Sequence, residues 1–139
     1  MPSAGIILVS SDAHLEELLT ETLKEVQTLV RVPPALQSLK EALHHRPALA
    51  IFHISGTGLD ERRRMKTLVE VAASKAPILL LGTQVDGATL FELSSEWKAS
   101  SAIVWSPQRA TFLQRLVQGI IRRHMEGGEG PMAPAEDET

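Results

Sequence analysis

Five short apolar runs alternate with segments of helical periodicity, and this alternation restricts the possible folds more than any other feature of the sequence. The runs are continuously apolar for the most part, which is typical of strands that are covered on both faces. They lie at Gly5–Val9, Thr28–Val32, Ala48–Ile54, Pro77–Leu81 and Ala102–Trp105. Regular strand–helix alternation predicts right-handed crossovers, and so an α/β fold in which a five-stranded parallel sheet carries helices on both faces.

The segments between the runs carry apolar residues three or four positions apart, so that each set lies on one face of a helix. Asp12 or Ser11 is suited to cap the first helix, and Pro34 is suited to begin the second. The predicted apolar faces are Leu15, Leu18, Leu19, Leu23 and Val26; Leu36, Leu39 and Leu43; Met65, Leu68, Val69 and Ala72; Leu90, Leu93 and Trp97; and Leu113, Leu116, Val117, Ile120 and Ile121.

Length and composition indicate one ordinary domain. The chain has 139 residues, of which 43% are hydrophobic, and this is enough to build a core without a metal or disulfide. We expect residues 1–126 to fold, and we expect residues 127–139, which are rich in Gly, Pro and acids, to form a disordered tail or linker.

The same numbers exclude several classes of function. With no cysteine, the chain has no disulfide, thiol nucleophile or thiolate metal site. A net charge of -3 argues against binding to nucleic acid. No apolar run is long enough to span a membrane and the N-terminus lacks a basic leader, so we expect a cytoplasmic protein. We also expect no cofactor.

The order of the elements, the loop lengths and four residues resemble a response-regulator receiver domain over about residues 5–124. The four residues are Pro47, Gly58, Pro77 and Pro107, the last in a Ser-Pro pair after the fifth strand. The resemblance implies a flavodoxin-like three-layer sandwich. It also implies a site at the carboxyl ends of the strands: an acid pair for Mg²⁺, an aspartate that accepts phosphate, a Thr or Ser, and a Lys-Pro pair.

This sequence departs from the receiver pattern at nearly every chemical position. The matching positions are Ser10 and Ser11 for the acid pair, His53 for the phosphate acceptor, Gly82 with Thr83 beside it for the hydroxyl, Ser106 with Pro107 for Lys-Pro, and Ile103 for the aromatic switch residue. Only Asp12 supplies a nearby carboxylate. Mg²⁺ requires hard oxygen ligands, and the carboxylate nucleophile and the lysine are missing. The resemblance therefore indicates a degenerate receiver that is not an enzyme.

His53 is the most informative of these residues, and three interpretations of it remain open. A polar residue at a strand end is expected to find hydrogen-bond partners, here among Ser10, Ser11 and Ser106. Alternatively, His53 accepts a phosphoryl group. In the third interpretation the pocket emptied by the serines and Gly82 senses a small molecule. The paired His44 and His45 are adjacent on a helix and are not expected to bind one metal.

Our main hypothesis is a pseudo-receiver that acts as a protein-interaction module in bacterial signal transduction. Receivers generally dimerise or bind partners through the fourth helix, the fifth strand and the fifth helix. The sequence places both of its tryptophans there, and tryptophan is enriched at interfaces. The predicted partner face, for a protein partner or for self-association, consists of Leu90, Trp97, Ile103 and Trp105. Packing within the core is the alternative for both tryptophans, and for Trp105 it is the favoured one. No membrane or nucleic-acid partner is expected.

Overall fold

The five predicted strands form one parallel sheet in the computed structural model, which describes residues 5–55 and 58–127. The strands are β1 (Ile6–Val9), β2 (Leu29–Val32), β3 (Leu49–Ser55), β4 (Ile78–Thr83) and β5 (Ser101–Val104). Their order across the sheet is β2-β1-β3-β4-β5, and every neighbouring pair is parallel. The predicted α/β fold class is confirmed.

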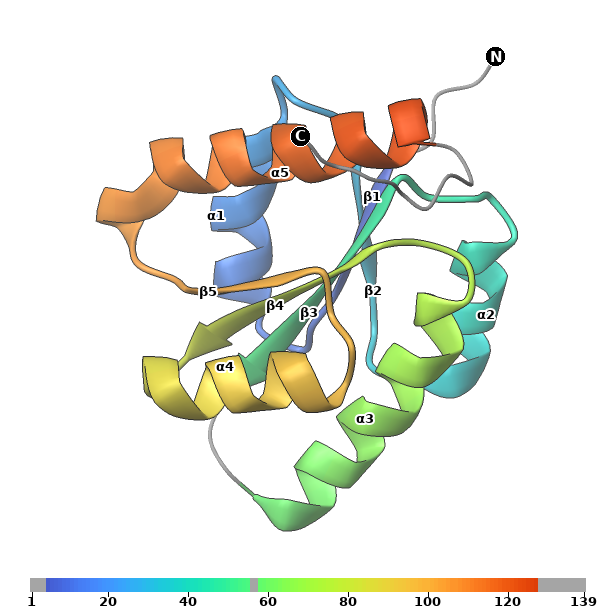
Figure 1. Cartoon of the computed structure of the whole chain (residues 1–139), viewed down its shortest axis with the longest axis vertical. Coiled ribbons are helices and arrows are strands. Elements are labelled where there is room, and N and C mark those ends of the chain that lie inside the picture. The colour runs from blue at the N-terminus through green and yellow to red at the C-terminus, as the bar shows by residue number, and fades with distance from the viewer. Residues whose placement is uncertain (1–4, 56–57, 128–139) are drawn as a thin grey trace.

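Five helices cover the two faces of the sheet (Figure 1). Helices α1 (Ala13–Leu23) and α5 (Ala110–Gly127) lie on one face, and a short 3-10 helix (Pro107–Arg109) precedes α5. The opposite face is covered by α2 (Leu36–Leu43), α3 (Leu59–Ala73) and α4 (Gly87–Glu96). The three layers bury the sheet on both sides, which explains why its strands read as continuous apolar runs.

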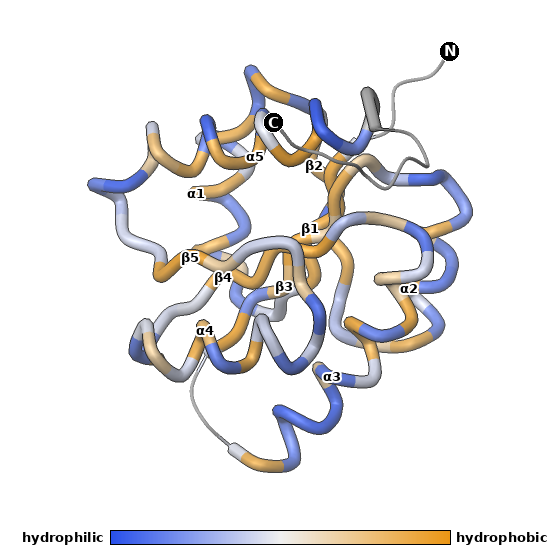
Figure 2. Tube along the Cα trace, in the orientation of Figure 1, coloured by the Kyte–Doolittle hydropathy of each residue, from blue (hydrophilic) through white to orange (hydrophobic). Residues whose placement is uncertain are grey.

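The core is divided by the sheet into two halves. Successive strand residues point to opposite faces, so Leu49 and Ile51 pack toward α1 and α5 while Ala50 and Phe52 pack toward α2, α3 and α4. Figure 2 shows hydrophobic colour along the central strands and a mixture of polar and apolar positions along the helices. The helices therefore contribute one face each, as their periodicity predicts.

Two of the predicted helix details are wrong. The second helix begins at Leu36 and not at Pro34, because Ala35 is extended and its N–H donates to the Pro33 carbonyl at 2.7 Å, which closes a tight turn around Pro34. Leu18 and Leu36 were assigned to buried faces but are exposed large hydrophobics. Leu36 is the first residue of α2, and Leu18 lies next to the buried Leu19.

Side-chain caps fix the start of two helices. Asp12 caps α1, and its Oδ1 accepts a hydrogen bond from the Leu15 N–H at 3.1 Å. Asp86 caps α4 in the same way by accepting from the Thr89 N–H at 2.7 Å, and these bonds lower the pKa of Asp86. Such caps satisfy backbone donors that the first turn of a helix leaves free. Of the two predicted caps for α1, Asp12 is the one used.

Among the described residues, no helix combines the length and the apolar character needed to cross a membrane. The predicted tail, 127–139, starts one residue too early, because Gly127 is the last residue of α5. Residues 128–139 and the loop residues 56–57 lie outside the described residues.

Two phenylalanines provide a test of this core. Phe52 is fully buried in β3, whereas Phe91 on α4 is 71% exposed. Replacing Phe52 with alanine should lower the free energy of unfolding by about 3–5 kcal/mol, because it removes a packed ring and leaves a cavity. Phe91→Ala should change it by no more than about 0.5 kcal/mol. Urea unfolding measures both, and equal losses would contradict this arrangement of the core.

Candidate functional site

Polar residues from three strands meet at the carboxyl edge of the sheet, where doubly wound folds bind their ligands. Ser10 directly follows β1, His53 lies near the end of β3 and Thr83 ends β4. In the parallel register His53 is opposite Leu81 and Ser55 is opposite Thr83. His53 and Thr83 are therefore offset by two residues along neighbouring strands, with both side chains on the same edge.

His53 joins Ser10 and Thr83 in a hydrogen-bonded chain. Its Nδ1 lies 3.1 Å from Ser10 Oγ, and its Nε2 lies 2.7 Å from Thr83 Oγ1. The backbone N–H of Asp12 donates to Ser10 Oγ at 3.0 Å. A neutral imidazole has one donor and one acceptor nitrogen, and a hydroxyl can do either. Both tautomers of His53 are thus satisfied by the two hydroxyls.

Burial keeps the His53 ring in its neutral form. The side chain is only 6% exposed and Ser10 is 3% exposed. Loss of hydration lowers the pKa of His53 below the ordinary histidine value of 6.5, and the charges of Asp12 and Glu61 oppose this only in part. The ring is therefore uncharged at neutral pH, with both nitrogens in hydrogen bonds.

The predicted pocket residues are only partly brought together. Ser10 is confirmed as a partner of His53, but Ser11 is exposed, and no bond from Ser11 or Ser106 to His53 occurs among the described residues. The second partner is Thr83, the hydroxyl residue beside Gly82. The register between β3 and β4 brings Thr83 to His53, and one segment of sequence does not contain that register.

Gly82 does not leave an open pocket, contrary to our expectation. A Cβ atom added there would lie 2.6 Å from Val85 Cγ1 and 3.0 Å from Leu90 Cδ2. The space that glycine vacates is already filled by the start of α4. Ser106 precedes the short 3-10 helix, with Pro107 at its first position as predicted, but Ser106 makes no side-chain cap.

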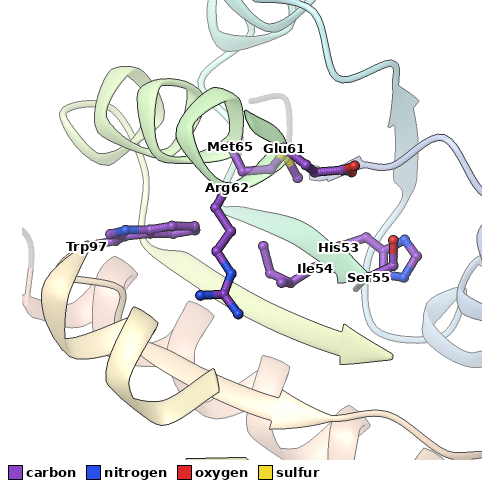
Figure 3. Close-up of a pocket in the computed structure, with 7 residues that line it drawn as sticks. All are labelled: His53, Ile54, Ser55, Glu61, Arg62, Met65 and Trp97. Carbon is purple, nitrogen blue, oxygen red and sulfur yellow. The ribbon is translucent and has the colours of Figure 1, made fainter. Parts of the chain in front are cut away.

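The cavity beside His53 is small. It measures about 10 Å³ and is lined in part by His53, Glu61, Arg62 and Trp97, a size that holds roughly one water molecule. Figure 3 shows Arg62 reaching from α3 between Trp97 and Ile54, while the side chains of His53 and Ser55 lie farther from Trp97. Among the described residues, the buried Arg62 Nε has no hydrogen-bond partner. Ser10 and Thr83, which bond to the His53 ring, do not line this cavity.

Carboxylates near the site are isolated from one another. Asp12 is exposed and its Oδ1 is engaged as a helix cap. Glu61 is exposed on α3. Within residues 5–55 and 58–127, no three His, Asp or Glu side chains come together as a metal site would require. The arrangement offers Mg²⁺ no cluster of oxygen ligands.

Three residues of the predicted partner face belong to the core. Leu90, Trp97 and Ile103 are 1%, 5% and 3% exposed, because they point inward from α4 and β5, and only Trp105 is partly exposed. The burial of Trp97 agrees with packing in the core, the alternative to a partner face. The exposed aromatic residues are instead Phe91 on α4, at 71%, and Phe112 on α5, at 55%.

The signal for these two residues was present in the sequence. Phe91 follows Leu90 and Phe112 precedes Leu113, and both leucines lie on the apolar stripes. Adjacent helix residues point about 100° apart, so a phenylalanine beside a buried leucine is turned toward solvent. Reading the stripe strictly would have placed both rings outside the core.

The lowered pKa of His53 predicts a pH-dependent stability. Protonation is less favourable in the folded than in the unfolded chain, so the contribution of His53 is complete above pH about 6.5 and is lost as the pH falls below that value. His53→Gln, which cannot titrate, should remove this part of the decline. The free energy of unfolding, measured in urea on both sides of this pH, checks it. His45→Gln, at an exposed histidine, is the control. If the stability of His53→Gln varied with pH as that of the original chain does, His53 would not be the source of the decline.

Comparison with known proteins shows the same fold in several solved structures. No family model and no curated protein matches the sequence. A CheY-like tadZ protein from Pseudomonas aeruginosa superposes with a TM-score of 0.69 at 16% identity, over 85% of this chain and 99% of that one. For a response regulator from Thermotoga maritima the TM-score is 0.67 at 14% identity, over 87% and 99% of the two chains.

A putative pilus assembly-related protein from Burkholderia pseudomallei gives a TM-score of 0.66 at 16% identity, over 86% of this chain and 90% of that one. Identities this low establish the fold and not the activity. The strand order β2-β1-β3-β4-β5 agrees with that of flavodoxin-like doubly wound folds. The chain thus has the fold of response-regulator receiver, or CheY-like, domains.

Proposed function

We propose that this protein is a receiver-like signalling module that acts by binding protein and is not phosphorylated on an aspartate. One observation carries the proposal: the side chain at the position expected for the phosphate acceptor is His53, which is buried and bonded at both ring nitrogens. A group in this state is neither a carboxylate nucleophile nor an exposed imidazole.

The surrounding chemistry supports the same proposal. Phosphoryl transfer depends on cations that neutralise the charge on the transferred group. The position expected for lysine holds Ser106, and the nearby carboxylate of Asp12 caps α1. Phosphorylation of His53 itself would require breaking its bond to Ser10 or to Thr83 at a ring that is only 6% exposed.

A binding role is supported by the exposed rings on α4 and α5. These two helices flank the edge strand β5 (Figure 1). Phe91 and Phe112 each expose more than half of their surface, while Trp105 after β5 is partly exposed. Aromatic side chains dominate the energetics of protein interfaces. We place the docking surface for a protein partner, or for a second copy of this chain, on these three residues.

The role described for one similar structure is compatible with this proposal. The Burkholderia pseudomallei protein is described as putatively pilus assembly-related, and an assembly role depends on binding other proteins. By analogy, we extend to the present chain only the use of a receiver-like fold for docking.

The degenerate phosphorylation pocket allows a direct test of this proposal. Titration with Mg²⁺ and beryllofluoride, which mimics a phosphorylated aspartate, should produce no saturable change in the amide NMR signals of Ser10–Asp12, His53 or Ser106. The reason is the lack of clustered carboxylate ligands in the described residues. A saturable shift centred on these loops would overturn the proposal. Acid-labile phosphate on His53 after incubation with acetyl phosphate would favour the phosphotransfer alternative instead.

The docking surface on α4 and α5 allows a separate test. Replacing Phe91 and Phe112 together by serine should abolish self-association in sedimentation experiments, or capture of a protein partner, because two exposed rings are removed from the interface. Stability should change by no more than about 0.5 kcal/mol per site, since neither ring is buried.

Leu59→Ser is the matched control for this experiment. Leu59 is 64% exposed at the start of α3, so this change removes a comparable apolar side chain from another surface. It should leave association unchanged. Association that survives in the double phenylalanine variant, or that is lost equally in Leu59→Ser, would contradict the assigned surface.

A further inference from the structure

A second concave surface lies at the amino edge of the sheet, away from His53. Helices α2 and α3 lead directly into β3 and β4, so their C-terminal ends lie beside the amino ends of these strands. A groove of about 460 Å³ separates the two helix ends and has Leu43 and Val71 in its lining. It continues as a groove of about 500 Å³ that reaches His124 near the end of α5. This size falls within the range of ligand-binding clefts.

The charged residues that line this groove are all basic. Lys40 and Lys75 line its first part, and Arg46 and Lys75 line its second part. All three side chains are exposed, and among the residues that the structure describes no carboxylate lines either part. The two ion pairs found among the described residues join Lys24 to Glu21 and Arg31 to Glu16, and so involve none of the three. Three exposed cations, unpaired within the described part of the chain, therefore face a partly apolar groove on a protein whose net charge is -3.

The backbone at Arg46 is the turn that ends α2. Arg46 has a φ of 53°, in the left-handed region that glycine or asparagine normally occupies after a helix. Lys98 has the same conformation after α4, with a φ of 60°, so this backbone marks the end of a helix and is not specific to the groove. An arginine in this conformation carries a cost that glycine would avoid.

The groove combines cationic side chains with the C-terminal ends of two helices, and this combination favours an acidic peptide over a phosphate. Helix ends present carbonyl groups and partial negative charge. A phosphate offers only acceptor oxygens, which the carbonyls repel. An acidic peptide offers carboxylates for the cations, N–H donors for the carbonyls and apolar side chains for Leu43 and Val71. We propose that this groove binds a short acidic, partly apolar peptide segment of a partner protein, with Lys40, Arg46 and Lys75 pairing to its carboxylates.

Fluorescence anisotropy tests the proposal on the full chain, with a labelled peptide that alternates glutamate and leucine. The peptide should bind saturably and more weakly as salt is raised. The same peptide with glutamine in place of glutamate should not bind, because the pairing requires carboxylates. Tripolyphosphate should compete poorly at equal ionic strength, because it lacks donors and apolar groups.

Arg46→Gly separates binding from stability. It should weaken peptide binding about fivefold to tenfold, since a charge-assisted hydrogen bond is lost. Its melting temperature should stay the same or rise, because glycine relieves the left-handed backbone. Lys98→Gly is the matched control: Lys98 also has a positive φ, of 60°, after a helix, but it does not line the groove. That variant should bind within about twofold of the original chain.

Several outcomes would overturn the proposal. Equal weakening by Arg46→Gly and Lys98→Gly would show attraction to overall charge and no defined site. Binding of the glutamine peptide would show that carboxylates are not recognised, and strong competition by tripolyphosphate would indicate a phosphate ligand. No saturable binding of the glutamate peptide would remove the site altogether. This groove is remote from Phe91 and Phe112, so its failure would leave the proposed docking surface on α4 and α5 unaffected.

Discussion

Burial of the sheet on both faces is the constraint on which the rest of this structure depends. Strands β3 and β4 are central and almost wholly buried, so their side chains are apolar until the strands approach solvent at their ends. The polar side chains of these two strands lie at their carboxyl ends. A polar side chain that is buried at the end of a strand must find a hydrogen-bond partner, because an unpaired polar group in this environment is costly. His53 is the consequence of this requirement at the carboxyl edge.

The Ser10–His53–Thr83 chain solves this requirement without a ligand. Several carboxylates converging at this edge would repel one another and would need a cation to balance them. A neutral histidine between two hydroxyls satisfies its donors and acceptors internally. Each ring nitrogen of His53 therefore has a partner, and the two bonds join β3 to Ser10 after β1 and to the end of β4.

The sequence was most informative where one physical requirement acts alone. The apolar runs and the helical stripes predicted the strands and helices, because both patterns follow from burial. Features that depend on relations between elements were harder to obtain. The choice of Thr83 over Gly82 is fixed by the register between β3 and β4. The burial of Trp97 depends on how α4 meets the sheet, and the backbone at Arg46 depends on the path from α2 to β3. The periodicity of a single segment predicts none of these relations between elements.

The two proposed surfaces follow from the same layered architecture. Helix α5 carries Phe112 in its first turn and His124, beside the basic groove, in its last turn. A helix rises 1.5 Å per residue, so the twelve positions between them separate the two sites by about 18 Å. The two proposed surfaces therefore lie at opposite ends of α5. If the bonds of His53 hold the carboxyl edge of the sheet in one conformation, neither proposed surface needs a phosphorylation event to become available. Partner binding would then be controlled by the supply of partners, since a ligand that binds two states equally shifts neither. The buried parallel sheet supplies the stable fold on which both proposed surfaces depend.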